Sequence, residues 1–552
     1  MTLFALILIP LAFSLIVAAR PEKDAKSTAL VGTLVAFAGA VYTLFEFDWA
    51  RAAQFQLEGS IAWLRQLGGT AFKRGDMVVW EGGVSLNVGV DSVAIMLVAL
   101  TALLGPICVL ASFTAINHRV KTYYAWLLGL QAAMTMVFVA RDVIMFYVGF
   151  EFTLIPMWIL INLYGSTNRR KAATKFFLYT FTGSMIALAG IVYVAWKGAS
   201  HAGYWSFDIG ALQSAAAWLS PREQAWVFFA LLAGFAVKVP LFPFHTWLPL
   251  AHTEAPTAGS VILAGVLLKL GTYGIFRFAI PLAPNAAFEY APLIATVSII
   301  GIVYAGLICW VQTDVKKLVA YSSVAHLGFC ILGLFAFNTT GITGSVLYMI
   351  NHGLSTGALF LMIGMIYERY HTRSMKELGG LASRMPIWST FMVFFTMASV
   401  GLPGLNGFVS EFLCLIGTFQ ASDHWQGDVG GTGGNLGFWY AAIAGTGMIV
   451  AAMYLLYMVG KVVFGPLHEP HGDHGHASHG DDHAPKLPTD LNKREIGILV
   501  PLAVLCIAMG VYPKPLLDAL KDPSAQMTRT VEAGRKAAAA FGQPSRPLPE
   551  TK

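Results

Sequence analysis

The sequence predicts an all-α protein that crosses a membrane about fourteen times and contains two inverted five-helix repeats, each with one discontinuous helix. Three observations support this fold class. Of the 552 residues, 56% are hydrophobic and only 12% are charged, which is unlike the composition of soluble globular proteins. Apolar runs that are long enough to cross a hydrocarbon core follow one another along the chain. Prolines and glycines break two of these runs beside a charged residue.

The apolar runs divide the chain into five parts. Residues 1–122 hold three spans and a polar external loop at 48–88, and two five-span repeats follow at 123–278 and 290–464. A histidine-rich cytoplasmic loop at 465–495 precedes the last span and an external tail at 496–552. The predicted spans are 2–19, 28–45, 90–113, 123–140, 143–164, 175–196, 224–237, 257–278, 290–310, 315–337, 341–366, 386–419, 437–464 and 496–511.

The first run has neither a charged leader nor an A-x-A cleavage site, so we interpret it as a retained span rather than a cleaved signal peptide. Lysine and arginine gather in every second connection, and these loops are cytoplasmic by the positive-inside rule. The intervening loops FNTTGIT and QASDHWQGDVGGTGGN contain neither residue. Both termini are therefore predicted on the external side of the membrane.

The first break lies in the sequence FAVKVPLFPFHTWLP, where Lys238 stands well inside an apolar run. A lysine at this depth costs roughly 2.5–3.5 kcal/mol on insertion scales. Pro240 and Pro243 each remove a backbone hydrogen-bond donor just behind it. Irregular backbone at membrane depth is tolerated where it is buried in protein or lines a cavity, as at the ion sites of transporters.

The second break lies in the sequence GLPGLNGF, where Pro403 and its neighbouring glycines interrupt the span 386–419. Glu411 follows about one helical turn later. Two interrupted spans in corresponding positions indicate an internal duplication, and an odd number of spans per copy implies inverted repeats. The alternative is a pair of ordinary proline kinks, which are frequent in membrane helices.

Six ionisable residues are expected at membrane depth, each in a different span. A single buried histidine is more often a satisfied structural group than a functional one. Six such groups instead resemble a row of proton-exchanging side chains, because burial and neighbouring charges shift the pKa values of carboxyl, amine and imidazole groups. The candidate relay residues are Glu151, Lys238, Lys269, His326, His352 and Glu411.

Near the predicted cytoplasmic end of the first broken helix, His245, His252 and Glu254 are candidates for a proton access path, with interfacial packing as the alternative. The loop HEPHGDHGHASHGDDHAP is glycine- and aspartate-rich and predicts a solvated segment, so we assign no metal to its histidines. These are His468, His471, His474, His476, His479 and His483.

Nothing in the sequence indicates a redox centre or a nucleic-acid surface. The five cysteines stand singly in apolar segments, without the spacing of an iron–sulfur or zinc site. The net charge of +6 is carried by the loops. No haem, flavin or nucleotide motif is apparent, so we expect no cofactor in this chain.

Four segments carry a resemblance to a known family: MFYVGFEFTLIPMWILI, FAVKVPLFPFHTWLPLAHTEAPTAGSVILAGVLLKLGTYG, VAYSSVAHLGF and GLPGLNGFVSEF. They resemble the antiporter-like membrane subunits of proton-translocating NADH:quinone oxidoreductase, respiratory complex I. The resemblance covers essentially the whole chain, and the run HTWLPLAHTEAPT is its most specific part. The acid at Glu411 and the short tail after Val511 resemble the M-type branch, whereas the L-type branch usually has a lysine and a long lateral helix.

The resemblance implies the following roles. Glu151 and Lys238 would form a coupled carboxylate–lysine pair, Lys269 would be the central relay lysine, and Glu411 the terminal acid. L- and N-type subunits would flank the chain in the lipid bilayer of a bacterial inner membrane, with both termini in the periplasm. NADH, FMN, iron–sulfur clusters and quinone are expected in partner subunits.

Other functional classes remain open from the sequence. A subunit of a multi-subunit cation/proton antiporter and a subunit of a membrane-bound hydrogenase share these motifs. A purely structural membrane scaffold is the third alternative, and the cost of six buried ionisable groups disfavours it.

Overall fold

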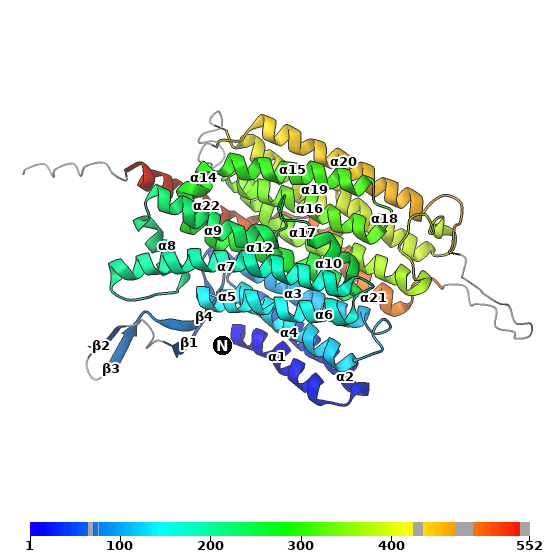
Figure 1. The fold of residues 1–552 in the computed structure, drawn as a ribbon, viewed down its shortest axis with the longest axis horizontal. Coiled ribbons are helices and arrows are strands. Elements are labelled where there is room, and N and C mark those ends of the chain that lie inside the picture. The colour runs from blue at the N-terminus through cyan, green and yellow to red at the C-terminus, as the bar shows by residue number, and fades with distance from the viewer. Residues whose placement is uncertain (65–69, 75–76, 423–433, 471–488, 541–552) are drawn as a thin grey trace, which may run out of the picture.

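The computed structural model describes residues 1–552 except 65–69, 75–76, 423–433, 471–488 and 541–552. Figure 1 shows long helices that run side by side, with short strands at one end of the bundle. Within the described part of the chain, 12 helices are long and apolar enough to cross a membrane. This confirms a polytopic helical membrane protein.

Most of these helices are continuous from end to end. They are α1 (Thr2–Ala19), α2 (Ala25–Glu46), α3 (Ser92–Ala111), α4 (Val120–Val139), α7 (Arg169–Ala202), α15 (Ala291–Trp310), α16 (Val315–Leu334), α17 (Thr339–Tyr370), α20 (Phe438–Val462) and α21 (Lys493–Val511). One further span joins α5 (Val143–Phe152) to α6 (Leu154–Tyr164) through Thr153. Another joins α11 (Thr257–Ile262), α12 (Leu268–Gly274) and α13 (Ile280–Leu282) through two π-helical segments, Leu263–Leu267 and Ile275–Ala279.

Both predicted breaks interrupt a helix. The helix α9 (Pro221–Lys238) ends just before Pro240, and α10 (Leu248–Glu254) begins after an irregular segment. The indole of Trp247 donates to the Val237 carbonyl at 2.9 Å, which satisfies an acceptor left free by the interruption. The second interruption separates α18 (Pro386–Val400) from α19 (Asn406–Gln420), and Gly401 there has φ +82°, a left-handed conformation that favours glycine.

The connections that are rich in lysine and arginine lie at one end of the bundle. The amine of Lys26 in the first of them donates to the Phe113 carbonyl in the second at 2.7 Å. Thr114 in the second donates to Glu368, at the end of α17, at 2.5 Å. The N-terminus lies at the other end of the bundle (Figure 1). The assignment of the basic end to the cytoplasm stays a prediction.

The segment predicted as an external loop contains β-strands, so the all-α class is correct for the spans and wrong here. Strand β1 (Gln56–Leu64) pairs antiparallel with β4 (Val84–Val90), and β2 (Thr70–Arg74) pairs antiparallel with β3 (Met77–Glu81). The runs are rich in valine and aromatic residues, which favour strands, but they are short and surrounded by glycine and charge. Strands β2 and β3 lie between β1 and β4 in the sequence, so the pairing of β1 with β4 cannot be predicted from local sequence.

The predicted tail beyond Val511 is also ordered, as the helix α22 (Lys514–Ala540). Its buried positions recur at helical spacing, with Leu520, Met527 and Val531 among them. Thr343 at the start of α17 donates to Ser524 at 3.0 Å, so α22 covers the end of the bundle that holds the N-terminus and the strands. Short connecting elements complete the fold: α8 (Ile209–Ala215), α14 (Pro284–Glu289) and the 3-10 turns Glu22–Asp24, Trp49–Arg51, Ala216–Trp218 and Leu381–Ser383.

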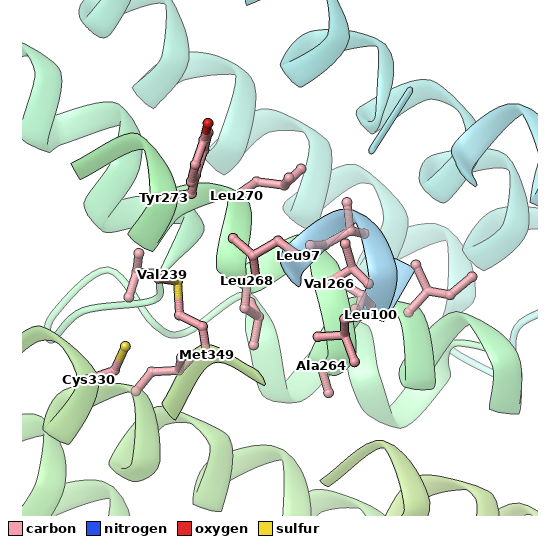
Figure 2. Close-up of a cluster of buried hydrophobic side chains, with 14 of the residues drawn as sticks. Leu97, Leu100, Val239, Ala264, Val266, Leu268, Leu270, Tyr273, Cys330 and Met349 are labelled. Atoms are coloured by element: carbon pink, nitrogen blue, oxygen red, sulfur yellow. The ribbon is translucent and has the colours of Figure 1, made fainter. Parts of the chain in front are cut away.

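The span 257–282 occupies the centre of the bundle. The most apolar part of this span is fully buried, whereas the outer spans expose many apolar side chains to their surroundings. Figure 2 shows apolar side chains around this span, including Leu97 and Leu100 from α3 and Met349 from α17. A charged side chain in this core must find hydrogen-bond partners within the protein, because an unpaired buried charge costs several kcal/mol.

Candidate functional site

Lys269 lies in this core, on the short α-helical segment between the two π-helical segments. Its side chain is fully buried. The amine donates to the Ala264 carbonyl, five residues earlier in the first π-helical segment, and lies 2.7 Å from Nδ1 of His352. π-Helical turns are often found at functional sites, because the changed backbone pairing redirects polar groups. The central lysine is thus held by one backbone acceptor and one imidazole.

His352 belongs to a polar face of α17. His326 on α16 lies beside it, with 5.9 Å between the two ring centroids. Nδ1 of His326 is 2.6 Å from the Tyr348 hydroxyl and 3.2 Å from Oε1 of Glu411. Tyr348 also donates to this carboxylate oxygen. Lys269, His352, His326 and Glu411 therefore form a row. Close polar contacts join its first and last pairs, and the middle step lies between two imidazole rings with 5.9 Å between their centroids.

The second helix interruption gives Glu411 its position. Glu411 is buried on α19, and a Cβ atom at Gly401 would lie 2.5 Å from its Oε2. Glycine at the interruption therefore makes room for the carboxylate. This explains structurally why a break and a buried acid occur so close together in the sequence.

The groups in the first half of the chain are arranged more loosely. The amine of Lys238 donates to Thr153 at 3.2 Å and lies 4.6 Å above the ring of Phe150. Glu151 is half-buried, and its Oε1 has no hydrogen-bond partner among the described residues. The two charges interact electrostatically, but no ion pair within 4.0 Å joins them in the described structure. The fold brings the predicted pair together without direct contact.

The three candidates for proton access separate into two places. Glu254 lines a cavity of about 190 Å³ at the basic end of the bundle, together with Tyr164, Lys316, Glu368 and Arg373. His252 is fully buried behind it, stacked on Phe360 with 4.6 Å between ring centroids, and neither ring nitrogen has a partner in the described structure.

His252 also interacts electrostatically with Lys316, which lines the cavity, and with the central Lys269. His245 instead packs beside Phe242 and Tyr304, with ring centroids 5.8 and 6.0 Å away. The structure therefore brings His252 and Glu254 together and leaves His245 apart.

Tyr348 is the main residue that sequence reasoning missed. Acids, lysines and histidines stand out in apolar spans, whereas a tyrosine hydroxyl in such a span looks like ordinary packing. The available signal was its spacing, since Tyr348 precedes His352 by four residues and shares a helix face with it. Thr153, the acceptor for Lys238, had no comparable signal.

The cysteines and histidines show no metal centre in the described residues. All five cysteines are buried and free, and no group of three or more His, Cys, Asp or Glu residues there could hold a metal ion. Five of the six histidines in the histidine-rich loop, at 471–483, lie outside the described residues. The sixth, His468, pairs through its backbone with Gly379.

Comparison with known proteins decides the family. The family described as "NADH:quinone oxidoreductase/Mrp antiporter, TM" matches residues 140–437. Subunit M of NADH-quinone oxidoreductase from Rhodobacter capsulatus is 38% identical over 93% of this chain and 92% of its own length. Chain 4 of NADH-ubiquinone oxidoreductase from Marchantia polymorpha is 39% identical over 94% of this chain and 95% of its own. The chain belongs to the M-type antiporter-like subunits of NADH:quinone oxidoreductase.

Chains of two solved complexes share the same fold. A chain of respiratory complex I from Thermus thermophilus, determined with bound NADH, superposes with a TM-score of 0.80 at 26% identity and covers 96% of this chain and all of that one. A chain of the Mrp complex from Dietzia sp. reaches 0.73 at 20% identity, covering 96% and 99%, which shows a common fold alone. Residues 140–437 include every candidate relay and access residue named above.

Proposed function

We propose that this M-type subunit carries protons across the membrane through Glu151, Lys238, Lys269, His352, His326 and Glu411, and that quinone reduction elsewhere in the complex drives the transfer. The observation that best supports this is the row from Lys269 to Glu411, in which a buried amine meets an imidazole at 2.7 Å and a second imidazole meets a carboxylate at 3.2 Å. These distances suit proton transfer between neighbouring groups.

Each group can take part in proton transfer from Lys269 towards Glu411. The Lys269 ammonium donates a proton to Nδ1 of His352, which releases the proton on its other ring nitrogen. His326 accepts a proton and passes one from Nδ1 towards the Glu411 carboxylate. Each histidine thus conducts a proton by taking it on one ring nitrogen and releasing it from the other.

Glu151 and Lys238 act as the switch at the start of this row. When the carboxylate approaches, it stabilises the ammonium form of Lys238, and when the carboxylate moves away, the lysine loses this support and releases its proton. The separated arrangement of the two groups corresponds to the second condition.

Protons reach Lys269 from the cytoplasm through the cavity beside Glu254 and then through His252. The support for this path is the position of His252, which interacts with Lys316 at the cavity and with Lys269 in the core. His245 lies apart, against Phe242 and Tyr304, and serves as a second and minor access residue at the first helix interruption.

The proposal extends to the architecture and the partners. Counting the two interrupted segments α9–α10 and α18–α19 with the uninterrupted helices gives fourteen spans, arranged as inverted repeats at 123–278 and 290–464. L- and N-type subunits flank the chain in a bacterial inner membrane, and both termini face the periplasm. NADH, FMN, iron–sulfur clusters and quinone bind to partner subunits, while this chain takes no part in electron transfer.

The alternative is a subunit of a cation/proton antiporter complex or of a membrane-bound hydrogenase. The fold shared with the Mrp complex supports keeping this alternative, although the full-length relatives at 38–39% identity favour NADH:quinone oxidoreductase. Mass spectrometry of the detergent-solubilised complex separates the two. Flavin-, nucleotide- and quinone-binding partners support our proposal, whereas small antiporter subunits contradict it.

The decisive functional test replaces the central lysine. We expect Lys269→Ala to lower proton pumping at least about tenfold, because an acid–base group in the row is lost. Proton uptake and NADH:quinone reductase activity are measured in membranes, and assembly is checked by native gel. An assembled Lys269→Ala complex that pumps at the unsubstituted rate would show that the buried row is structural.

A further inference from the structure

The Tyr348 hydroxyl occupies the last step of the row, between an imidazole and a carboxylate. The side chain lies on α17, one helical turn before His352 and on the same face. It is 3% exposed, as is His326, and Glu411 is 2% exposed. A proton that moves among these three groups therefore passes between protein atoms in a desolvated site.

Two paths connect His326 to Glu411. The direct path joins Nδ1 of His326 to Oε1 of Glu411 over 3.2 Å. The second path runs from Nδ1 to the Tyr348 hydroxyl over 2.6 Å, and this hydroxyl donates a hydrogen bond to the same Oε1. The contact of Nδ1 with the hydroxyl is shorter than its contact with the carboxylate. Proton transfer becomes faster as donor and acceptor approach hydrogen-bond distance, so the hydroxyl offers the better path.

We propose that Tyr348 is itself a proton carrier, and that its hydroxyl relays the proton between His326 and Glu411. This inference rests on the proposed function of the row and adds a residue to it. A hydroxyl is suited to this position because it accepts one hydrogen bond while donating another. Phenylalanine would fill the same space and lack both properties.

The step is balanced in protons and charge. Protonated His326 donates the proton on Nδ1 to the Tyr348 oxygen, and the hydroxyl proton passes to Oε1 of Glu411. His326 becomes neutral, Glu411 becomes a neutral carboxylic acid, and Tyr348 ends as a neutral phenol. Because the two transfers are concerted, the phenol returns to its starting state after its hydroxyl rotates, and no tyrosinate has to form in the desolvated site.

The test compares Tyr348→Phe with Tyr124→Phe in the assembled complex. Tyr124 is a matched control, since it is fully buried on α4 and its hydroxyl has no partner among the described residues. We expect Tyr348→Phe to slow proton pumping about tenfold, because a charge-assisted hydrogen bond of the kind lost is worth roughly that factor. The residual rate comes from the direct contact between His326 and Glu411. Tyr124→Phe should leave the pumping rate unchanged.

A second variant distinguishes proton transfer from simple positioning. Fluorinated tyrosine at position 348 keeps the ring and the hydroxyl but makes the phenol a stronger acid. We expect the pumping rate and its solvent deuterium isotope effect to change with fluorination, whereas a residue that only positions Glu411 would leave both unaltered.

Glu411→Gln tests whether the row conducts protons at all, independently of the role of Tyr348. If Glu411→Gln abolishes pumping while Tyr348→Phe and the fluorinated variant pump normally, the row conducts protons and the role of Tyr348 is refuted. If Glu411→Gln also pumps normally in an assembled complex, the proposed function itself fails.

Discussion

Each half of the chain holds a buried or half-buried glutamate and its ionisable neighbours, and the two sets differ in how closely they contact one another. In the second half, His326 and Glu411 lie 3.2 Å apart and share the Tyr348 hydroxyl. In the first half, Lys238 donates to Thr153 instead of Glu151, and Glu151 keeps an oxygen without a protein partner. In the second half, close polar contacts already join the acid to its neighbours. In the first half, a side chain has to move before the acid and the lysine can form an ion pair.

The surroundings of the two acids explain this difference. Glu411 faces the interior, where His326 on α16 and Tyr348 on α17 contact its carboxylate. Glu151 is half-buried on α5, and the adjacent Val148 and Phe152 are exposed on the outside of the bundle. A side chain near the outer surface has room to change conformation, and this freedom is what a switch requires. Packing on all sides removes that freedom from Glu411.

The largest expected effect comes from removing the loose pair. Glu151→Ala and Lys238→Ala should each abolish most proton pumping, because either change leaves the switch without its opposite charge. Residues that act as one unit are strongly non-additive, so the double variant should pump little worse than either single variant. Proton uptake and quinone-reductase activity are measured in four assembled complexes: the unsubstituted one, the two single variants and the double variant.

Thermal unfolding of the same four proteins tests whether Glu151 and Lys238 are in direct contact, as His326 and Glu411 are in the second half. The two substitutions should be nearly additive in their effect on the free energy of unfolding, because no direct contact joins the pair in this structure.

Glu151→Asp keeps the charge with a shorter reach and should retain part of the pumping activity. Normal pumping by an assembled Glu151→Gln complex would mean that the pair has a structural role only.

An intermediate effect is expected at the candidate access residues. His252→Ala should lower pumping several-fold, because His252 interacts both with Lys316 at the cavity and with the central Lys269. His245→Ala should change the rate by less than about twofold, since His245 packs against Phe242 and Tyr304 rather than against a residue of the row. Proton uptake by the two variants is compared at equal assembly. A larger loss with His245→Ala would place the main access path at the first helix interruption instead.

The smallest effect concerns Asp142, which caps the N-terminus of α5, the helix that carries Glu151. Its carboxylate accepts from the backbone of Ile144 at 2.8 Å and Met145 at 3.2 Å, and burial raises its pKa from 3.8 to about 7. The folded carboxyl group thus binds its proton more tightly than the unfolded one. Its contribution to stability is present below about pH 4 and is lost as the pH rises to about 7.

Asp142→Asn keeps an oxygen for the cap and removes the titration. Hydrogen–deuterium exchange over residues 142–152 measures the local stability at several pH values. We expect the unsubstituted protein to lose protection relative to the variant between pH 5 and 7, by up to about tenfold per pH unit. Parallel pH profiles of the two proteins would show that Asp142 does not titrate in this range.

Several features of this protein follow from local sequence. Apolar runs of sufficient length predict membrane helices because hydrocarbon tolerates no unpaired backbone, and the two helix interruptions follow from Pro240 and Pro403, which lack a backbone donor. The positions of the buried ionisable groups and the family resemblance also come from the sequence, and the comparisons confirm the family. Each of these properties depends on residues that are neighbours along the chain.

Only the tertiary structure decided which of these groups touch. Lys269 and His352 are 83 residues apart in sequence, and His326 and Glu411 are 85 apart, so their contacts depend on how four helices pack. The same holds for Tyr348, whose hydroxyl gains its importance from side chains on two other helices, and for the separation of His245 from His252. The strand pairing of β1 with β4 and the docking of α22 also join distant segments. Helix packing fixes side-chain distances to within a few tenths of an ångström, and no local pattern in the sequence carries that information.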